Sequence, residues 1–283
     1  MIVLKDISKL RSLLSDVRKT KTIGFVPTMG FLHEGHISLV KMCKESTEFT
    51  VVSIFVNPTQ FAPTEDLNRY PRDEKGDLEK LENAGTDLVF FPDKATMYPG
   101  GFQTYVEVQE LTKPLCGATR GTSHFRGVST VVAKLFNMVQ PDKAFFGKKD
   151  FQQLAVIKQM VKDLNYPVEI IPGETVREND GLAMSSRNSY LSPADRKSSV
   201  CLSRGLFLAR DKYHAGDIRI DEIELFAADF IKANAPQSRI DYVQCLDADK
   251  LTIPTPETKN LVLACAVFFQ RTRLIDNVTF TVS

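Results

Sequence analysis

Short apolar runs alternate with segments of helical periodicity along the first 175 residues. The runs fall at 23–26, 51–56, 88–91, 144–146 and 168–171. Between or before them, segments 7–17, 73–84, 128–139 and 150–164 carry apolar residues at three- and four-residue spacing. Strands that alternate with helices predict an α/β fold, a Rossmann-like doubly wound parallel sheet with helices on both faces.

The pattern changes after residue 175. A polar stretch at 175–192 is followed by a helix that begins at Ser192-Pro193, a second helix near 221–233, and strands near 240–245, 261–269 and 278–282. Helices followed by strands, without further alternation, predict a smaller C-terminal α+β domain. We therefore expect a ligand-binding domain at 1–175 and a domain at 176–283 that closes over the site.

Composition narrows the class of protein. The 283 residues are 43% hydrophobic and 25% charged, and the formal net charge is +1. The chain has no basic excess, which argues against nucleic acid as a partner. It also has no apolar stretch near 18 residues and no leader-like start, so we expect a cytoplasmic protein that does not cross a membrane. The five cysteines include no C-x-x-C pair and are expected to be buried thiols.

The stretch 22–40, TIGFVPTMGFLHEGHISLV, predicts a strand, a tight turn and a helix. His33 and His36 stand three residues apart at the helix start, where backbone N–H groups and the helix dipole favour an anion. A zinc site is disfavoured, because no further ligands complete a shell and HEGH is not H-E-x-x-H. A histidine that only caps the helix remains open, but we favour an anion site, with phosphate as the ligand.

Two further segments offer cations. In FFGKKDFQQ, at 145–153, the turn between a strand and a helix carries Lys148 and Lys149, and Lys149, Asp150 and Gln153 share one helix face. In the polar stretch, Met184 to Arg187 supply two hydroxyls and a guanidinium that can grip phosphate oxygens. A plain solvated turn or loop is the alternative in each case.

Two loops offer amides or arginines. Asn57 and Gln60 follow the second strand and could orient a small polar substrate. Arg120 and Arg126, in RGTSHFRG at 120–127, are either anion contacts or surface charges. No G-x-S-x-G motif and no nucleophile-base pair occurs, which favours direct transfer by positioning and electrostatics over covalent catalysis.

Five motifs together resemble a known family. VPTMGFLHEGH, SIFVNPTQF, FFGKKDFQQ, LAMSSRN and RLIDN occur in order over almost the whole chain. In this respect the sequence is similar to the pantothenate synthetases, the pantoate:beta-alanine ligases. The first motif alone would indicate only a HIGH-type nucleotidyltransferase.

The resemblance implies an ATP-dependent ligase. Pantoate and ATP would give pantoyl adenylate and pyrophosphate, and beta-alanine would then displace AMP to give pantothenate. Mg²⁺ is implied on the triphosphate, and a homodimer is usual in the family. The expected partners are therefore pantoate, beta-alanine and ATP, without nucleic acid or membrane.

Site residues follow from the same resemblance. Its catalytic residues would be His36, as proton donor, with His33, Lys149 and Arg187. Pantoate would contact Gln60, Gln153 and Asn57, and Gln60 would also contact beta-alanine. No residue is assigned to a protein-bound metal. The ATP site would comprise Met29, Gly30, Phe31, Leu32, His33, Glu34, Gly35, His36, Gly147, Lys148, Lys149, Asp150, Val176, Met184, Ser185, Ser186 and Arg187.

The chain departs from the family in one place. The family reads R-P-G-H-F where this chain has RGTSHF at 120–125, one residue longer and without the proline. Segment 61–72 is a candidate lid that would shield the intermediate from water. The alternatives are another small-molecule nucleotidyltransferase, or an ATP-binding module without catalytic activity.

Overall fold

The computed structural model describes residues 1–61 and 67–282. Their contacts divide the chain into two compact units. The larger unit comprises residues 1–110, 120–148 and 153–174, and the smaller unit comprises residues 111–119, 149–152 and 175 onward. The sequence prediction placed segments 111–119 and 149–152 in the first domain, 1–175, whereas the contacts of the chain group them with the smaller unit. Hydrogen bonds join both segments to strands of the smaller unit: the Leu115 N–H donates to Gln244, and the Lys149 carbonyl accepts from Asn277.

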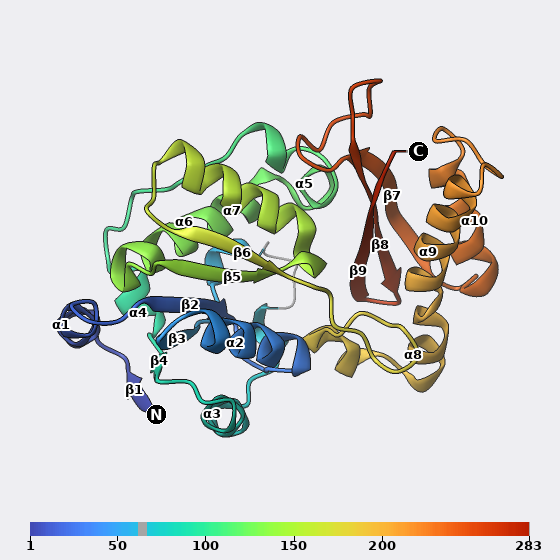
Figure 1. Cartoon of the computed structure of the whole chain (residues 1–283). Coiled ribbons are helices and arrows are strands. Elements are labelled where there is room, and N and C mark those ends of the chain that lie inside the picture. Colours follow the sequence, from blue (N-terminus) through green and yellow to red (C-terminus); the bar gives the residue numbers. More distant parts are fainter. Residues whose placement is uncertain (62–66, 283) are drawn as a thin grey trace. The chain divides into compact units, whose positions relative to one another are not determined.

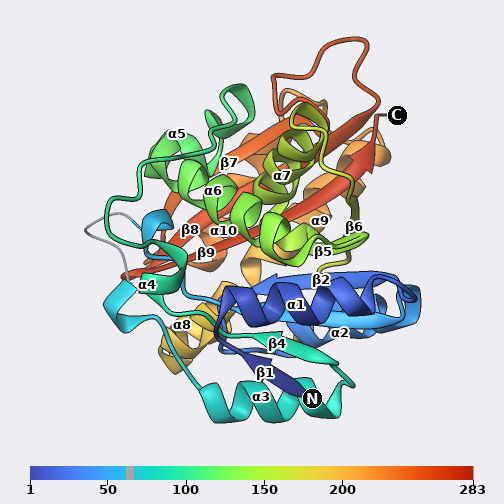
Figure 2. The same ribbon diagram turned by 90° about the vertical axis from the view of Figure 1, so that its left-hand side faces the viewer.

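The larger unit contains a six-stranded parallel sheet, which Figures 1 and 2 show from two sides. The strand order is β1-β4-β3-β2-β5-β6. From β2 the chain proceeds outward through β3 and β4, and β5 then returns to the other side of β2. The neighbours β2 and β5 therefore mark the switch in strand order. The strands are β1 (Ile2–Leu4), β2 (Ile23–Thr28), β3 (Phe49–Ile54), β4 (Leu88–Phe90), β5 (Lys143–Gly147) and β6 (Glu169–Gly173).

Helices cover both faces of this sheet. Adjacent strand residues point to opposite faces: Phe145 joins the core under α2, whereas Phe146 contacts Phe136 of α6. Burial on both faces explains why the strands read as continuous apolar runs. The α-helices of this unit are α1 (Ile7–Val17), α2 (Glu34–Ser46), α3 (Glu74–Asn83), α4 (Lys94–Met97), α6 (Thr122–Val139) and α7 (Phe151–Asp163), although the first two residues of α7 group with the smaller unit.

The smaller unit packs helices against an antiparallel sheet of order β7-β8-β9. Its core joins Leu202 and Leu206 of one helix, Ala227 and Ile231 of the next, and the buried face of the central strand. The elements are α5 (Cys116–Arg120, whose last residue groups with the larger unit), α8 (Pro193–Ser199), α9 (Cys201–His214), α10 (Ile223–Asn234), β7 (Arg239–Asp247), β8 (Asn260–Phe269) and β9 (Thr272–Thr281). Together the two sheets confirm the predicted fold class.

The structure differs from the sequence prediction in several local features. Strand β2 runs through Pro27, where the ladder to β5 has already ended at Phe25 and a missing N–H is tolerated. Strand β1 is too short and too exposed to leave a pattern. The single helix expected from Ser192-Pro193 onward is two helices, divided at Val200, and α6 begins before the predicted residue 128.

Short 3₁₀ turns connect several elements: η1 (Pro58–Gln60), η2 (Leu67–Arg69), η3 (Glu110–Thr112), η4 (Lys148–Asp150) and η5 (Ser186–Tyr190). The candidate lid at 61–72 includes residues 62–66, which lie outside the described residues. Within the described part of the chain, no helix combines the length and the apolar character that a membrane span requires.

Candidate active site

The first predicted site is the turn between β2 and α2. Gly30 and Phe31 both have positive φ, at 81° and 51°, so the chain reverses within two residues before the helix begins. His33 is the N-cap, and its Nδ1 accepts a hydrogen bond from the Gly35 N–H at 3.2 Å. The His36 Nδ1 accepts from the His33 N–H at 3.2 Å, and the two ring centroids are 4.1 Å apart.

These hydrogen bonds define the tautomer of both rings. Because each Nδ1 is an acceptor, a neutral His33 or His36 carries its proton on Nε2. The turn follows β2 directly, at the carboxyl end of the strand where the strand order switches. Ligands of doubly wound proteins bind at this position. The structure therefore brings the two histidines together where an acid or hydrogen-bond donor could act on a ligand.

A carboxylate already occupies the backbone amides of this turn. Asp77 of α3 accepts from the Phe31 N–H and the Leu32 N–H, each at 2.7 Å. Phe31 and Leu32 were predicted to line the ATP site, and these two N–H groups are engaged by a protein anion. Sequence reasoning did not find Asp77, because it lies 45 residues beyond Leu32 in the chain.

Gln60 lies on a platform built from Asn57 of its own turn, helix α6 and the β2–α2 turn. The Asn57 Nδ2 donates to the Gln60 Oε1 and to the Gly127 carbonyl, each at 3.1 Å. The Gln60 Nε2 lies 3.0 Å from the Met29 sulfur, so two predicted site residues meet here. The backbone carbonyl of Gln60 lies 2.7 Å from the Nδ1 of His124. The platform fixes both the side chain and the backbone of Gln60.

The third group of predicted site residues in the larger unit lies at the end of β5 and just beyond it. Gly147 pairs with Gly173 of β6, and Lys148 forms an ion pair with Glu174. Gln153 is half-buried near the start of α7. The carboxyl ends of β2 and β5 are neighbours in the sheet, so the predicted residues of the larger unit fall at one edge.

In the smaller unit, strand β9 makes hydrogen bonds to Lys149 and to the polar stretch at 175–192. The Asn277 Nδ2 donates to the Lys149 carbonyl at 2.9 Å. The preceding residue, Asp276, is 2% exposed and accepts two hydrogen bonds from Arg177, at 2.7 and 2.9 Å. Arg177 also donates to the Gly181 carbonyl at 3.0 Å. A bidentate ion pair on a buried carboxylate therefore anchors the hairpin that carries the residues predicted to bind phosphate.

That hairpin brings four of its predicted residues together. The Met184 N–H donates to the Val176 carbonyl at 3.0 Å, and the Arg187 N–H donates to the Ser185 hydroxyl at 3.3 Å. Ser186 is buried and begins the turn η5. The RLIDN motif thus supplies Asp276 and Asn277 as supports for this loop and for Lys149, a role that the sequence did not indicate.

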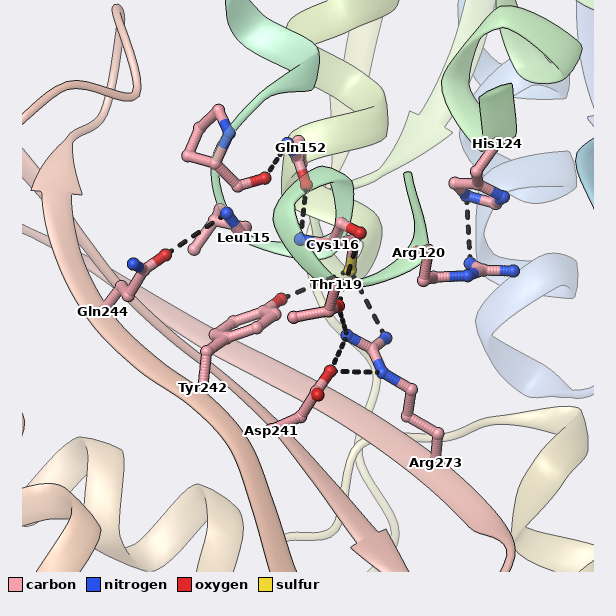
Figure 3. A network of polar contacts seen from close by, with 11 residues as sticks. Leu115, Cys116, Thr119, Arg120, His124, Gln152, Asp241, Tyr242, Gln244 and Arg273 are labelled. Carbon is pink, nitrogen blue, oxygen red and sulfur yellow. Dashed lines mark hydrogen bonds and ion pairs between the residues drawn. The ribbon is translucent and has the colours of Figure 1, made fainter. Parts of the chain in front are cut away.

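Arg273, the first residue of that motif, joins the network drawn in Figure 3. Its guanidinium donates twice to Asp241, at 2.8 and 3.0 Å, and once to the Cys116 sulfur at 3.4 Å. The Tyr242 hydroxyl lies 3.3 Å from the same sulfur. Gln152 completes the network by accepting from the Cys116 N–H at 3.0 Å. These contacts explain why segments 111–119 and 149–152 belong to the smaller unit.

The fold and the histidine turn define an α/β protein of the doubly wound class, with a candidate ligand site at the switch in strand order. A family model described as pantoate-beta-alanine ligase matches residues 2–279. A protein of Acetivibrio thermocellus named pantothenate synthetase is 51% identical over 279 residues, which cover 98% of this chain and 99% of that protein.

Solved structures agree with the family model. The crystal structure of pantothenate synthetase from Thermus thermophilus matches with a TM-score of 0.93 at 43% identity, over 98% of this chain and 99% of that one. The pantoate-beta-alanine ligase of Francisella tularensis, complexed with a compound named beta-gamma ATP and with beta-alanine, matches with a TM-score of 0.81 at 33% identity, over 98% and 97%. The chain belongs to the pantoate-beta-alanine ligase family.

Proposed function

We propose that the protein condenses pantoate with beta-alanine to pantothenate in an ATP-dependent reaction that passes through pantoyl adenylate and releases pyrophosphate and AMP. The observation that carries this proposal is the match of the family model over residues 2–279. The Francisella relative with an ATP compound and beta-alanine supports the same substrates. A carboxylate is a poor acyl electrophile at neutral pH, so esterification with AMP would supply the leaving group that the amine displaces.

We assign the roles in the larger unit as follows. Gln60 and Gln153 would hold pantoate, with Gln60 also meeting beta-alanine. His33 and His36 would face the nucleotide through Nε2–H donors, which can stabilise charge that develops on phosphate oxygens. Because Asp77 engages the Phe31 and Leu32 amides, we infer that these histidines carry the polar contacts of the turn.

In the smaller unit, Lys149 and Arg187 would supply the cations for the phosphates. The Ser185 and Ser186 hydroxyls and the backbone of Val176 would contact the nucleotide beside them. Arginine can bind a phosphate in bidentate fashion, whereas lysine acts as a point charge. Asp276 and Asn277 are adjacent in strand β9 and anchor the two segments that carry Arg187 and Lys149. They would therefore keep these two cations at a fixed spacing.

Magnesium would enter with the nucleotide. Among residues 1–61 and 67–282, no three histidine, cysteine, aspartate or glutamate side chains gather as metal ligands. Mg²⁺ bound to nucleotides takes most of its ligands from phosphate oxygens and water. We propose an ion held on the triphosphate, where it would offset the charge of the leaving pyrophosphate.

Exchange of labelled pyrophosphate into ATP tests the proposal. We expect exchange that depends on pantoate, and AMP release only after beta-alanine is added. Exchange without pantoate would favour another nucleotidyltransferase, and ATP binding without turnover would favour a binding module. ADP as the product would contradict the proposed chemistry.

We also propose that the protein is a cytoplasmic homodimer that associates through the larger unit. Light scattering should then give a mass near twice the 31.8 kDa of one chain. A mass of one chain at micromolar concentration would contradict the dimer.

A further inference from the structure

Helix α3 presents two charged side chains to the histidine turn. The Asp77 carboxylate is 1% exposed, and each of its oxygens accepts one backbone N–H, Oδ2 from Phe31 and Oδ1 from Leu32. Three residues further along the helix, the Lys80 ammonium donates to the Leu32 carbonyl at 2.7 Å. The two side chains lie on one face of α3 and together bind both polar groups of Leu32.

The backbone of the turn explains why an anion is needed there. Phe31 is a bulky residue with φ of 51°, a conformation that is costly outside glycine. Successive N–H groups in such a turn point to the same side and form an anion-binding nest. The Asp77 carboxylate fills this nest and so stabilises the strained conformation.

Gly30 allows α3 to approach this closely. A Cβ built on Gly30 would lie 3.0 Å from the Asp77 Oδ2 and 3.1 Å from a methyl carbon of Ile54, and the φ of 81° disfavours other residues. The turn, the strand and the helix therefore meet at one point, with the carboxylate at its centre.

Retaining this charge is unfavourable for Asp77 itself. Burial raises the pKa of the Asp77 carboxyl, opposed by the two backbone hydrogen bonds and by the nearby Lys80. A neutral side chain of similar size would avoid this desolvation cost, but it could not offer an acceptor oxygen to each of the two N–H groups. The charge thus orders the peptide that directly precedes His33.

We propose that Asp77 and Lys80 are positioning residues of the active site. They clamp Leu32 and thereby set the orientation of the His33 cap and, through the His33 N–H, of the His36 ring. This inference rests on the proposed function for its consequence in catalysis. Neither residue is assigned to substrate or nucleotide.

The variant Asp77→Asn tests the clamp with little change in volume. Its amide can accept only one of the two N–H groups and places a donor against the other. In pantoate-dependent pyrophosphate exchange we expect kcat to fall by about tenfold or more, as for other small displacements of reacting groups. KM for pantoate should change by less than about twofold, since Asn57 and His124, which lie outside this turn, still hold Gln60.

Two readouts separate positioning from general stability. The thermal midpoint of Asp77→Asn should not fall in proportion to activity, because the variant also relieves a buried charge. The ring N–H correlations of His33 and His36 in NMR spectra should shift, whereas those of His214 should not. The matched control is Asp73→Asn: Asp73 caps the same helix through the Gly76 N–H at 3.0 Å, and asparagine caps equally well.

A second variant, Lys80→Met, keeps the aliphatic stem of the side chain and removes the donor to Leu32. It should reduce kcat in the same direction while the helix remains folded. Wild-type kcat and unshifted histidine signals in both variants would overturn the inference, as would a loss of activity that only parallels a loss of the folded state. If the wild-type protein shows no exchange, the proposed function fails, and the histidine signals still test the clamp.

Discussion

Asn57 supports the candidate site without needing to touch a ligand. Its side chain is 1% exposed, and its Oδ1 accepts from the Tyr98 hydroxyl and the Thr59 hydroxyl, each at 2.9 Å. Its Nδ2 donates to Gln60 and to Gly127. The sequence predicted a substrate contact for Asn57. Because its polar groups are engaged inside the protein, we expect it to act through Gln60 instead.

Tyr98→Phe tests this platform. Burial raises the pKa of Tyr98, so its hydroxyl keeps the proton that it donates to Asn57. Losing one such hydrogen bond costs about 1 kcal/mol, which corresponds to a several-fold rise in KM for pantoate. KM for ATP should stay unchanged in the exchange assay. An equal rise in both constants would contradict a platform specific to Gln60.

Two buried thiols predict how stability depends on alkaline pH. Burial raises the pKa of Cys201 to about 11 and that of Cys245 to about 12. A folded-state pKa above the unfolded value means that the stabilisation is complete below pH about 9 and is lost as the pH rises toward 12. Urea unfolding at pH 8 and pH 10 should show this loss, on the order of 1 kcal/mol per thiol. Cys245→Ala should reduce it, and an unchanged pH slope would contradict the assignment.

At the scale of elements, α6 supports the Gln60 turn through a glycine. A Cβ on Gly127 would lie 2.5 Å from the Thr59 carbonyl oxygen and 2.8 Å from the Gln60 nitrogen, both backbone atoms that cannot easily move. Helix α6 and turn η1 can approach this closely only without a side chain at this position.

Gly127→Ala should therefore destabilise the protein, although a change from glycine to alanine inside a helix usually stabilises it. Alanine favours a helix interior over glycine by about 1 kcal/mol, yet we expect a net destabilisation of about 1–3 kcal/mol from the forced separation. KM for pantoate should rise with it. Gly100→Ala is the control, because nothing lies within 4 Å of its added Cβ. A stabilised Gly127→Ala variant would show that the approach is not needed.

Most of the elements could be predicted because local periodicity determines them. Strands β2 to β6 and helix α2 follow from apolar runs and spacing, and the histidine turn follows from its place between them. The roles of Asp77, Asp276 and Asn277 could not be predicted, because each depends on a partner at least 45 residues away in the chain. Such contacts arise only when the fold brings distant segments together.

At the scale of the whole molecule, the smaller unit is not one continuous stretch of chain. Segments 111–119 and 149–152 belong to it, and Cys116 and Gln152 contribute to the network around Arg273. The linear division into two consecutive domains missed this feature because the two segments are short and lie between elements of the larger unit.

A fragment of residues 175–283 should therefore be less stable than the same region in the full chain. Without segment 111–119, Tyr242 and Arg273 lose partners that are buried in the network. We expect faster amide exchange along β7 and β9 in the fragment, while α9 and α10 remain protected. Equal protection of β7 in the fragment and the full chain would contradict this account.

In the proposed reaction, the carboxylate of pantoate is activated as an acyl adenylate. An ¹⁸O label in that carboxylate tests it most directly, because one carboxylate oxygen becomes the bridge to phosphorus and leaves with AMP when the amine attacks. Mass spectrometry of the products should find one labelled oxygen in AMP and the other in pantothenate. Unlabelled AMP, or label in inorganic phosphate, would contradict the account.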